Sequence, residues 1–381
     1  MTYANTLADD MKGWLMPTAA QVREQILSLL LAWGIAPSQA QTSAEVMVDT
    51  DLSGVDSHGL SMLMDYDTSR RNGRLNLQAR PHVVRQAGAT ALIDADAGLG
   101  HTPAVMGMRI AIDAARAHGV GVACVRNSHH FGAAGYYVRL ASAEGMIGLC
   151  TSSTRTINTV PTGARVPVLG TNPIAFAAPA RRNPPFVLDM ATSSAASNKV
   201  KVYELRADPL PAGWVVDEHA ASVTDAAQAM DILFKRPKEI GGGLTPLGGS
   251  REMSSHKGHG LAMMVHILAG TLSGASFSPV RIKTQRTQDP DNLGHFFCAI
   301  DPAAFGSAET FGDDMDVLLD TLRATPRQQR PAPFSCTVIW KQRRANAAAV
   351  KEFRSRLRLP TTSADYARPL RSPSFSSEFR Q

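Results

Sequence analysis

Two histidine-containing segments hold side chains that could transfer a proton. The first, Asp56-Ser57-His58-Gly59, lies between two helical patterns. A histidine can exchange a proton near neutral pH, and a neighbouring hydroxyl group can orient its ring. His58 assisted by Ser57 is therefore a candidate general acid. The alternative interpretation is a histidine that packs against a helix or caps it.

The second segment runs from Arg126 to Gly135 and contains His129-His130. It follows an apolar run and precedes a helical pattern, which is where α/β sheets commonly bind ligands. Small residues let a ligand approach the backbone, and the N–H groups of a helix start favour an anion. Paired histidines could also bind a metal ion. That use needs further ligands, which no HxxxH or HExxH pattern supplies, so no metal is expected.

Three further segments place polar residues at turns and at the ends of elements. They are Gly170-Thr171-Asn172-Pro173, Asp189-Met190-Ala191-Thr192-Ser193 and Ser254-Ser255-His256-Lys257-Gly258-His259-Gly260. Lys257 would stand at the positive end of a helix, where the helix dipole disfavours a cation. An anion such as a phosphate, bound at this helix start, would explain the placement. A solvated lysine is the alternative.

The elements that position these segments follow from the spacing of apolar residues. Helical spacing predicts helices over 19–33, 37–52 with Ser38 as N-cap, 60–71, 104–118, 132–144, 193–205, 257–272 and 313–323. Short apolar or alternating runs predict strands over 82–86, 90–94, 119–125, 145–150, 174–178, 186–189 and 294–300. The chain is therefore predicted to be mixed α/β with a helical N-terminal unit.

No glycine-rich nucleotide motif accompanies these elements. Gly119-Val120-Gly121 begins the dinucleotide fingerprint G-x-G-x-x-G, but Cys124 holds its sixth position. Gly241-Gly242-Gly243 has no strand before it, and a Walker A lysine motif is absent. A bound nucleotide would therefore need another kind of site.

Charge and cysteine content limit the class of protein. Of the 39 Lys+Arg and 33 Asp+Glu residues, 12 and 3 lie in 327–381, so residues 1–326 hold 39 − 12 = 27 basic and 33 − 3 = 30 acidic groups. The body of the chain therefore has no charge reason to bind nucleic acid. The four scattered cysteines fit buried thiols in a reducing compartment. Because the sequence has no apolar run long enough for a membrane span and no signal-peptide pattern, the expected location is the cytoplasm.

Eight segments, taken in order, resemble the malate/L-lactate dehydrogenase family, which includes ureidoglycolate and sulfolactate dehydrogenases and diketogulonate and piperideine-2-carboxylate reductases. The segments are DLSGVDSHGLSML, VRNSHHFGAAGYYVRLA, EGMIGLCTSST, VLGTNPIAFAAPA, FVLDMATSSAA, TPLGG, SSHKGHGLAMMVHILAGTLSGA and NLGHFFCAIDP, and the resemblance runs from about residue 18 to about residue 325. It implies a nucleotide-binding fold distinct from the Rossmann fold, with a largely antiparallel sheet. It also implies NAD or NADP as cofactor, a small carboxylic acid as substrate, and a homodimer.

The resemblance implies roles for individual residues. His58, with Ser57 assisting, would protonate the substrate as hydride arrives, and His130 would be the third catalytic residue, where nicotinamide and substrate meet. Thr171 would contact the substrate. The residues implied in cofactor binding are His130, Phe131, Gly132, Ala133, Ala134, Ser153, Thr154, Asp189, Met190, Ala191, His256, Lys257 and Gly258.

These implications make the chain an NAD(P)-dependent oxidoreductase that transfers hydride between its cofactor and a small 2-oxo or 2-hydroxy acid. The alternatives within the family are a cyclic imino acid reductase and an impaired homologue that only binds a metabolite. A metal-dependent hydrolase and a protein that binds nucleic acid through its tail are the alternatives outside it. The sequence leaves open which acid is the substrate, whether NAD or NADP is used, and which direction the reaction takes.

The sequence departs from the family at position 62. Many members carry an arginine four residues after the motif histidine, where it pairs with the substrate carboxylate, but this chain has Met62. A bidentate arginine–carboxylate pair is strong and geometrically specific. Its absence favours either a bulkier, less polar substrate or a carboxylate held elsewhere, for instance by Arg70 or Arg71.

A second departure begins near Arg327. The family's Pro-Gly-Glu turn, which closes over the cofactor, is missing, and the sequence becomes basic and rich in serine and proline. This composition is typical of translation out of frame from about residue 326, and a genuine basic tail for an acidic partner is the alternative. Either would leave the tail poorly packed. The expected domains are a helical N-terminal domain (1–75), a strand-rich connection with part of the substrate domain (76–120), an NAD(P)-binding domain (121–300), a returning helix of the catalytic body (301–326) and the atypical tail (327–381).

Overall fold

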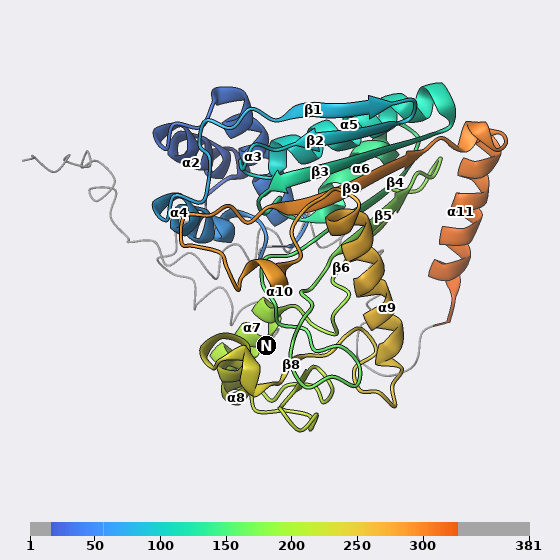
Figure 1. Ribbon diagram of the computed structural model, residues 1–381. Helices are drawn as coiled ribbons and strands as arrows, with labels where there is room; N and C mark the ends of the chain where they lie inside the picture. Colours follow the sequence, from blue (N-terminus) through green and yellow to red (C-terminus); the bar gives the residue numbers. More distant parts are fainter. Residues whose placement is uncertain (1–16, 56, 327–381) are drawn as a thin grey trace, which may run out of the picture.

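A seven-stranded mixed sheet lies at the centre of the protein, whose computed structural model describes residues 17–55 and 57–326 (Figure 1). The strands follow the order β1-β2-β3-β9-β4-β5-β6. They are β1 (His82–Ala87), β2 (Thr90–Asp94), β3 (Val120–Ser128), β4 (Ile147–Ser152), β5 (Ile174–Ala178), β6 (Phe186–Met190) and β9 (Leu293–Ile300). β2 and β3 are parallel, and all other neighbouring strands in this sheet are antiparallel. The predicted α/β class with a largely antiparallel sheet is confirmed.

The strand β9 lies between β3 and β4 although it follows them by more than a hundred residues. Ile300 of β9 pairs with Val120 of β3 on one side and with Ile147 of β4 on the other. The strands of the segments expected as 76–120 and 121–300 therefore belong to one sheet.

The N-terminal helices pack around a core of their own, in which Ile26 and Leu30 are fully buried. They are α2 (Ala19–Ala32), α3 (Pro37–Leu52), the 3-10 turn η1 (Leu60–Met62) and α4 (Leu63–Arg71). The prediction that Ser38 caps α3 is wrong. Ala36 holds the cap position without a side-chain hydrogen bond, and Pro37 takes the first helical position, where its missing N–H costs nothing.

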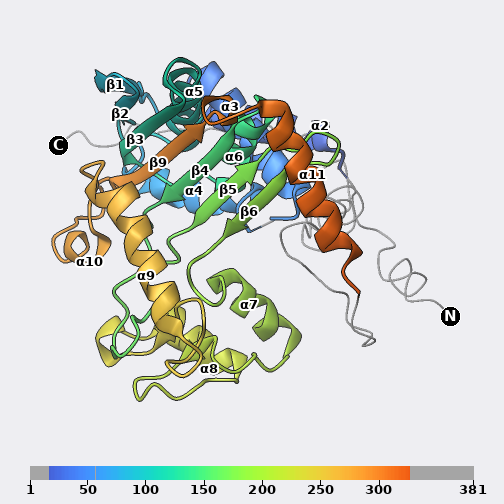
Figure 2. The same cartoon turned by 90° about the vertical axis from the view of Figure 1, so that its right-hand side faces the viewer.

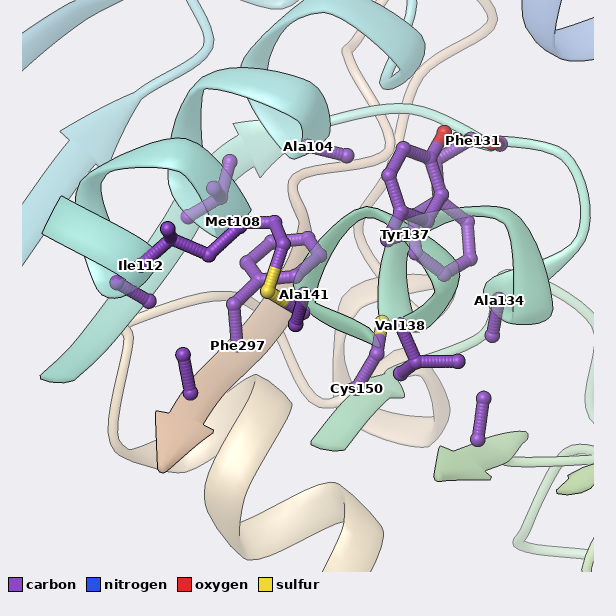
Figure 3. Packing of buried hydrophobic residues seen from close by; sticks show 14 of the residues in the cluster. Ala104, Met108, Ile112, Phe131, Ala134, Tyr137, Val138, Ala141, Cys150 and Phe297 are labelled. Atoms are coloured by element: carbon purple, nitrogen blue, oxygen red, sulfur yellow. Dashed lines mark hydrogen bonds between the residues drawn. The ribbon is translucent and has the colours of Figure 1, made fainter. Parts of the chain in front are cut away.

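Two helices cover one face of the sheet: α5 (His101–His118) and α6 (Ala134–Ala143). Tyr137 of α6 packs against Phe297 of β9 in the buried core between them (Figure 3). The sequence predicted that α6 begins at Gly132. It begins two residues later, because Gly132 has a left-handed backbone (φ 81°) that no helix can contain.

The opposite face is covered in part by α9 (Ser255–His266) and the π-helical turn η4 (Ile267–Thr271). The helix predicted over 257–272 is thus correct in its extent, but its hydrogen bonding changes after His266. Its core contacts on this face include Ala269 and Phe296.

The remaining elements fall into two groups. One forms a smaller lobe below the sheet, and the other comprises the helices near the end of the described chain (Figure 2). They are α7 (Ser197–Arg206), β7 (Val215–Val216), α8 (Ala226–Met230), η2 (Asp231–Lys235), η3 (Lys238–Ile240), β8 (Gly243–Leu244), α10 (Ser278–Arg281), η5 (Pro302–Ala304) and α11 (Ala308–Ala324). No described helix is both long enough and apolar enough to cross a membrane.

Candidate active site

The Ser57-His58-Gly59 segment is held against the last turn of α3. The carboxylate of Asp51 accepts a hydrogen bond from the backbone N–H of Leu60 at 2.9 Å. A side chain at position 59 would overlap this carboxylate, so only glycine fits there. The Oγ of Ser57 lies 2.8 Å from Nδ1 of His58. The segment therefore fixes both the path of the chain and the orientation of the His58 ring.

His58 faces His130, which comes from the loop after β3. The two ring centroids are 5.4 Å apart, with an angle of 33° between the ring planes. The backbone N–H of Gly132 lies 3.3 Å from Nδ1 of His130 and donates to it. Because Nδ1 is thus an acceptor, a neutral His130 carries its proton on Nε2. Two histidines predicted to be catalytic are therefore neighbours, and one of them offers an Nε2–H donor.

A buried tyrosine and a third histidine, neither predicted from the sequence, extend this pair. The Oη of Tyr66 lies 2.8 Å from Nδ1 of His130 and 3.4 Å from Nε2 of His101. Tyr66 lies on α4 and His101 begins α5. No sequence motif singles out either residue, because they meet only in the folded chain.

Burial keeps His130, His101 and Tyr66 uncharged. It is the main reason that the pKa of His130 lies well below its usual value, and the charges of His58, His101 and Arg155 lower it further. Burial also lowers the pKa of His101 to about 3 and raises the pKa of the Tyr66 hydroxyl. At neutral pH, the Tyr66 hydroxyl is therefore a donor to Nδ1, and His130 is a neutral hydrogen-bonding group.

His295, which is fully buried in β9, packs against the loop that carries His130. The ring of Phe131 is stacked on His295 at 4.4 Å and on Tyr137 at 5.0 Å, and Figure 3 shows the latter pair. His295 contacts the hydroxyl groups of Ser152 (2.8 Å) and Ser128 (2.9 Å), at the ends of β4 and β3. Burial lowers the pKa of His295 to about 3, so the neutral ring donates at one nitrogen and accepts at the other.

The turn at Thr171-Asn172 brings together segments that the sequence singled out separately. The side-chain amide of Asn172 donates to the carbonyl of Ala262 in α9 at 2.8 Å, and its oxygen accepts from Oγ1 of Thr154 at 3.0 Å. The N–H of Thr192 donates to the carbonyl of Thr171 at 2.8 Å. Thr154, Thr171 and the end of β6 therefore form one locality, with the Thr171 side chain half-buried.

The start of α9 belongs to the same locality. Its first turn presents His256 and Lys257 to solvent, whereas Gly258 is buried against the backbone of Leu247, where no side chain would fit. The N–H of Leu247 donates to the carbonyl of Thr192 at 2.8 Å. Lys257 forms no ion pair with the residues that the structure describes. An exposed cation at a helix N-terminus is thus available to an anion.

Asp189 connects the locality of Thr171 with α6, the helix that follows the loop of His130. Its Oδ2 accepts a hydrogen bond at 3.0 Å from the N–H of Gly135, in the first turn of α6, where the helix dipole favours a carboxylate. The hydroxyl of Ser153 accepts from the N–H of Gly294 at 2.9 Å, so this predicted cofactor contact also has a structural partner. Of the other predicted residues, Gly132, Ala133 and Ala134 are buried, and Met190 and Ala191 are half-buried.

The arginines considered as substitutes for an arginine at position 62 are engaged elsewhere. Asp67 binds the guanidinium groups of Arg70 and Arg71, at 2.7 and 2.6 Å. Arg70 also lies over the ring of Trp33, 5.2 Å from its centroid. Met62 itself is half-buried at the end of η1.

The described residues contain no group of three or more His, Cys, Asp or Glu side chains that could hold a metal ion. The hydrolase interpretation of the histidine pair therefore has no candidate metal site in 17–55 and 57–326.

Comparison with known proteins agrees with the resemblance found in the sequence. The profile described as malate/L-lactate dehydrogenase matches residues 18–347. A malate dehydrogenase of Pyrococcus horikoshii is 36% identical over 301 residues, which cover 79% of this chain and 80% of the relative. An L-sulfolactate dehydrogenase of Methanocaldococcus jannaschii is 35% identical over 304 residues, covering 79% and 82%.

One solved structure is similar to this chain over most of its length. The malate dehydrogenase of Entamoeba histolytica superposes with a TM-score of 0.82 at 28% identity, covering 89% of this chain and 92% of that one. The profile match extends past the boundary near residue 325 that the motifs predicted. The predicted frame change and poor packing of the tail lie outside the described residues.

Proposed function

The chain belongs to the malate/L-lactate dehydrogenase family and is an oxidoreductase acting on a small hydroxy acid, and on this premise we propose how its residues divide the work. His58 holds the proton that the substrate oxygen gains during reduction, with Ser57 fixing its ring. Neutral His130 donates a hydrogen bond from Nε2 to the same oxygen. The nicotinamide, when bound, supplies the hydride.

The pairing of His58 with a neutral His130 is the observation that carries this proposal. Reduction of a 2-oxo acid builds negative charge on the carbonyl oxygen, and positioned donors stabilise that charge before a proton reaches it. Two rings 5.4 Å apart can both approach one oxygen atom. The hydrogen bonds that Tyr66 and Gly132 make to Nδ1 of His130 keep the ring proton on Nε2, which is the nitrogen left for the substrate.

The residues fit a nicotinamide dinucleotide. Exposed His256 and Lys257 at the N-terminus of the twelve-residue helix α9 suit its phosphates. Asn172 links Thr154 to α9, and Asp189 links the segment 189–191 to the first turn of α6, the helix that follows His130. We propose that this binding uses no Rossmann motif, because the described sheet lacks a glycine fingerprint between strand and helix.

The proposal is tested by oxidation of NADH and of NADPH by the purified full chain, followed at 340 nm with pyruvate, oxaloacetate, 3-sulfopyruvate and Δ1-pyrroline-2-carboxylate. Turnover with a 2-oxo acid is expected, and the preferred coenzyme is then identified. Turnover with the cyclic imine alone would replace the proposed substrate class. Cofactor binding without turnover would identify an impaired homologue, and full activity in the presence of a chelator would exclude the metal-dependent hydrolase.

Replacing Lys257 by alanine is expected to raise the KM for the reduced coenzyme about tenfold and to leave kcat nearly unchanged, because one charge at a helix N-terminus contributes about 1–2 kcal/mol to anion binding. Steady-state kinetics at saturating acid measure this effect. Lys283, an exposed lysine just after α10, is the matched control, and Lys283→Ala should leave the KM unaltered. Equal KM values in the wild type and Lys257→Ala would contradict the phosphate role.

Replacing Met62 by arginine is expected to improve kcat/KM for pyruvate at least about tenfold, since a bidentate arginine–carboxylate pair is worth more than 1.4 kcal/mol. Met62→Leu keeps the apolar wall and should leave the ranking of substrates as it is. The ratio of kcat/KM for pyruvate to that for a bulkier acid such as phenylpyruvate is the quantity to compare. An unchanged ratio in Met62→Arg would show that position 62 does not face the substrate.

We propose finally that the chain forms a homodimer and acts in the cytoplasm. We also propose that the domain division given by its sequence separates segments with different roles, two of which share the central sheet. Several large apolar side chains on η4 and α10 are exposed in the single chain, namely Ile267, Val280 and Leu272 directly after η4. The described cysteines, Cys124, Cys150 and Cys298, are buried thiols, which suits a reducing compartment.

A further inference from the structure

Arg155 follows β4 by three residues and lies in the loop that also holds Thr154. Its carbonyl oxygen accepts a hydrogen bond from the guanidinium of Arg281 at 3.5 Å. The neighbouring Thr154 is tied to Asn172. The backbone at Arg155 is therefore fixed, while its side chain is 40% exposed.

The carboxylate nearest to Arg155 is Asp291, which is buried and already has closer partners. Nδ1 of His129 lies 3.3 Å from Asp291, and a guanidinium nitrogen of Arg74 lies 3.6 Å from it. Arg155 approaches the carboxylate only to 3.9 Å. Both ring nitrogens of His129 face acceptors, the second being the carbonyl of Arg74 at 3.1 Å. Asp291 is therefore neutralised without Arg155.

The cluster around Asp291 consequently carries surplus positive charge. Arg281 adds a third guanidinium group, which donates to the backbone carbonyl of Asp291. Its Nε is buried without a hydrogen-bond partner among the described residues. Three guanidinium groups thus gather around Asp291, of which that of Arg74 also interacts with Asp289, and the half-exposed Arg155 is the one that a ligand can reach. Surplus charge next to solvent is typical of a site for an anion.

This surplus charge lies next to the histidine pair. His129 of the cluster precedes His130 in the chain. After burial and the charges of His58 and His101, the charge of Arg155 is a further cause of the low pKa of His130. Arg155 and His129 contact the same carboxylate, that of Asp291, so the guanidinium lies on the side of the loop that leads to His130. The carboxylate of a 2-oxo acid is attached to its reacting carbon, so an acid held at the histidine pair could extend this group towards Arg155.

We propose that Arg155 binds the carboxylate of the substrate in this chain, in place of the arginine that position 62 lacks. The proposal rests on the proposed function and assigns the acid-recognising residue of the same site. It accounts for Met62, because a substrate carboxylate anchored from the β4 loop is held without an arginine on η1, although an arginine introduced there would still strengthen the binding. It also agrees with the pairing of Arg70 and Arg71 to Asp67.

The test compares Arg155→Met with Arg126→Met in the full-length protein. Arg126 is the matched control, since its side chain is also 40% exposed and also faces one carboxylate, Asp94, at 3.2 Å. Arg155→Met is expected to raise the KM for the best 2-oxo acid about 100-fold. The KM for the coenzyme should stay within about twofold of the wild type. Arg126→Met should change neither.

Binding of oxamate, an unreactive carboxylate, to the NADH-loaded protein gives a readout that needs no turnover. Isothermal titration should show about 100-fold weaker oxamate binding for Arg155→Met. Arg155→Lys retains the charge beside Asp291 and should lose only about tenfold, because lysine cannot form the bidentate pair. This variant keeps the test informative if Arg155→Met does not fold, as judged by thermal unfolding.

Unchanged oxamate binding in Arg155→Met would overturn the proposal, and so would a raised KM for the coenzyme with an unaltered KM for the acid. Failure of the proposed function looks different. In that case the wild type turns over no acid, while oxamate binding and its loss in Arg155→Met can still be measured. Turnover that is abolished in His58→Ala but indifferent to Arg155→Met would support the function and reject this role of Arg155.

Discussion

Replacing His58 by alanine is expected to lower kcat for reduction of the best 2-oxo acid about 1000-fold, within the range that a positioned general acid contributes. The KM for the coenzyme should change little, because His58 lies in the segment that follows α3 and not at the start of α9, where the phosphates of the coenzyme are proposed to bind. Ser57→Ala should cost only about tenfold, since the hydroxyl orients the ring and transfers no proton itself. Stopped-flow measurement of NADH oxidation separates this effect from product release.

His130→Ala is the informative comparison. Loss of a neutral donor to the developing oxyanion is expected to cost about 100-fold, less than the loss of the proton source. Tyr66→Phe removes the hydroxyl that lies 2.8 Å from Nδ1 of His130 and should reproduce part of this loss without changing the KM for the coenzyme. If His58→Ala kept most of its activity while His130→Ala lost all of it, the two roles would have to be exchanged.

The free energy of unfolding is expected to fall by at least about 4 kcal/mol between pH 7.5 and pH 5. Burial lowers the pKa of His101 and of His295 to about 3, whereas a histidine in the unfolded chain titrates near 6.5. Below pH 6.5 the unfolded chain therefore binds protons that the folded chain refuses, so stability decreases as pH falls from 6.5 towards 3. At pH 5 each histidine contributes about 2 kcal/mol to this loss, and His130, whose pKa is also lowered, adds to it.

Urea unfolding at pH 7.5, 6 and 5 measures this effect, which is large against a typical domain stability of about 5–15 kcal/mol. His101→Gln and His295→Asn should each reduce the loss of unfolding free energy between pH 7.5 and pH 5 by about 2 kcal/mol, although both variants are less stable than the wild type at pH 7.5. His219→Gln, at an exposed position, is the control and should leave the slope as it is. A wild-type free energy that stays constant from pH 7.5 to 5 would mean that these rings are not kept neutral by the fold.

Much of the fold could be predicted from local pattern. Strands such as β5 and the helix α2 were placed within a residue or two, because apolar residues recur there at the spacing of a strand or a helix. The motif glycines carry information of the same local kind. Gly59 and Gly258 have no room for a side chain, so a short sequence is tied to one packing arrangement. That is why the segments around them could be recognised before their partners were known.

What the sequence could not predict depends on contacts between distant segments. The insertion of β9 between β3 and β4 leaves no trace in the spacing of any one strand. Tyr66 and His101 meet His130 from two separate helices, and no local pattern records that meeting. The ion pairs of Asp67 with Arg70 and Arg71 are of the local kind, because their spacing of three and four residues on one helix is already present in the sequence.

The position of β9 also has a consequence for synthesis of the chain. Strands β3 and β4 leave the ribosome long before Ile300, which pairs with both, and until then each has an open edge. The N-terminal helices, whose contacts are local, can pack at once, whereas the central sheet must wait for nearly the whole described chain. Folding of this protein is therefore largely post-translational at its core. A nascent chain that stalls before residue 293 exposes the unpaired edges of β3 and β4. Such incomplete chains are expected to bind chaperones or to aggregate.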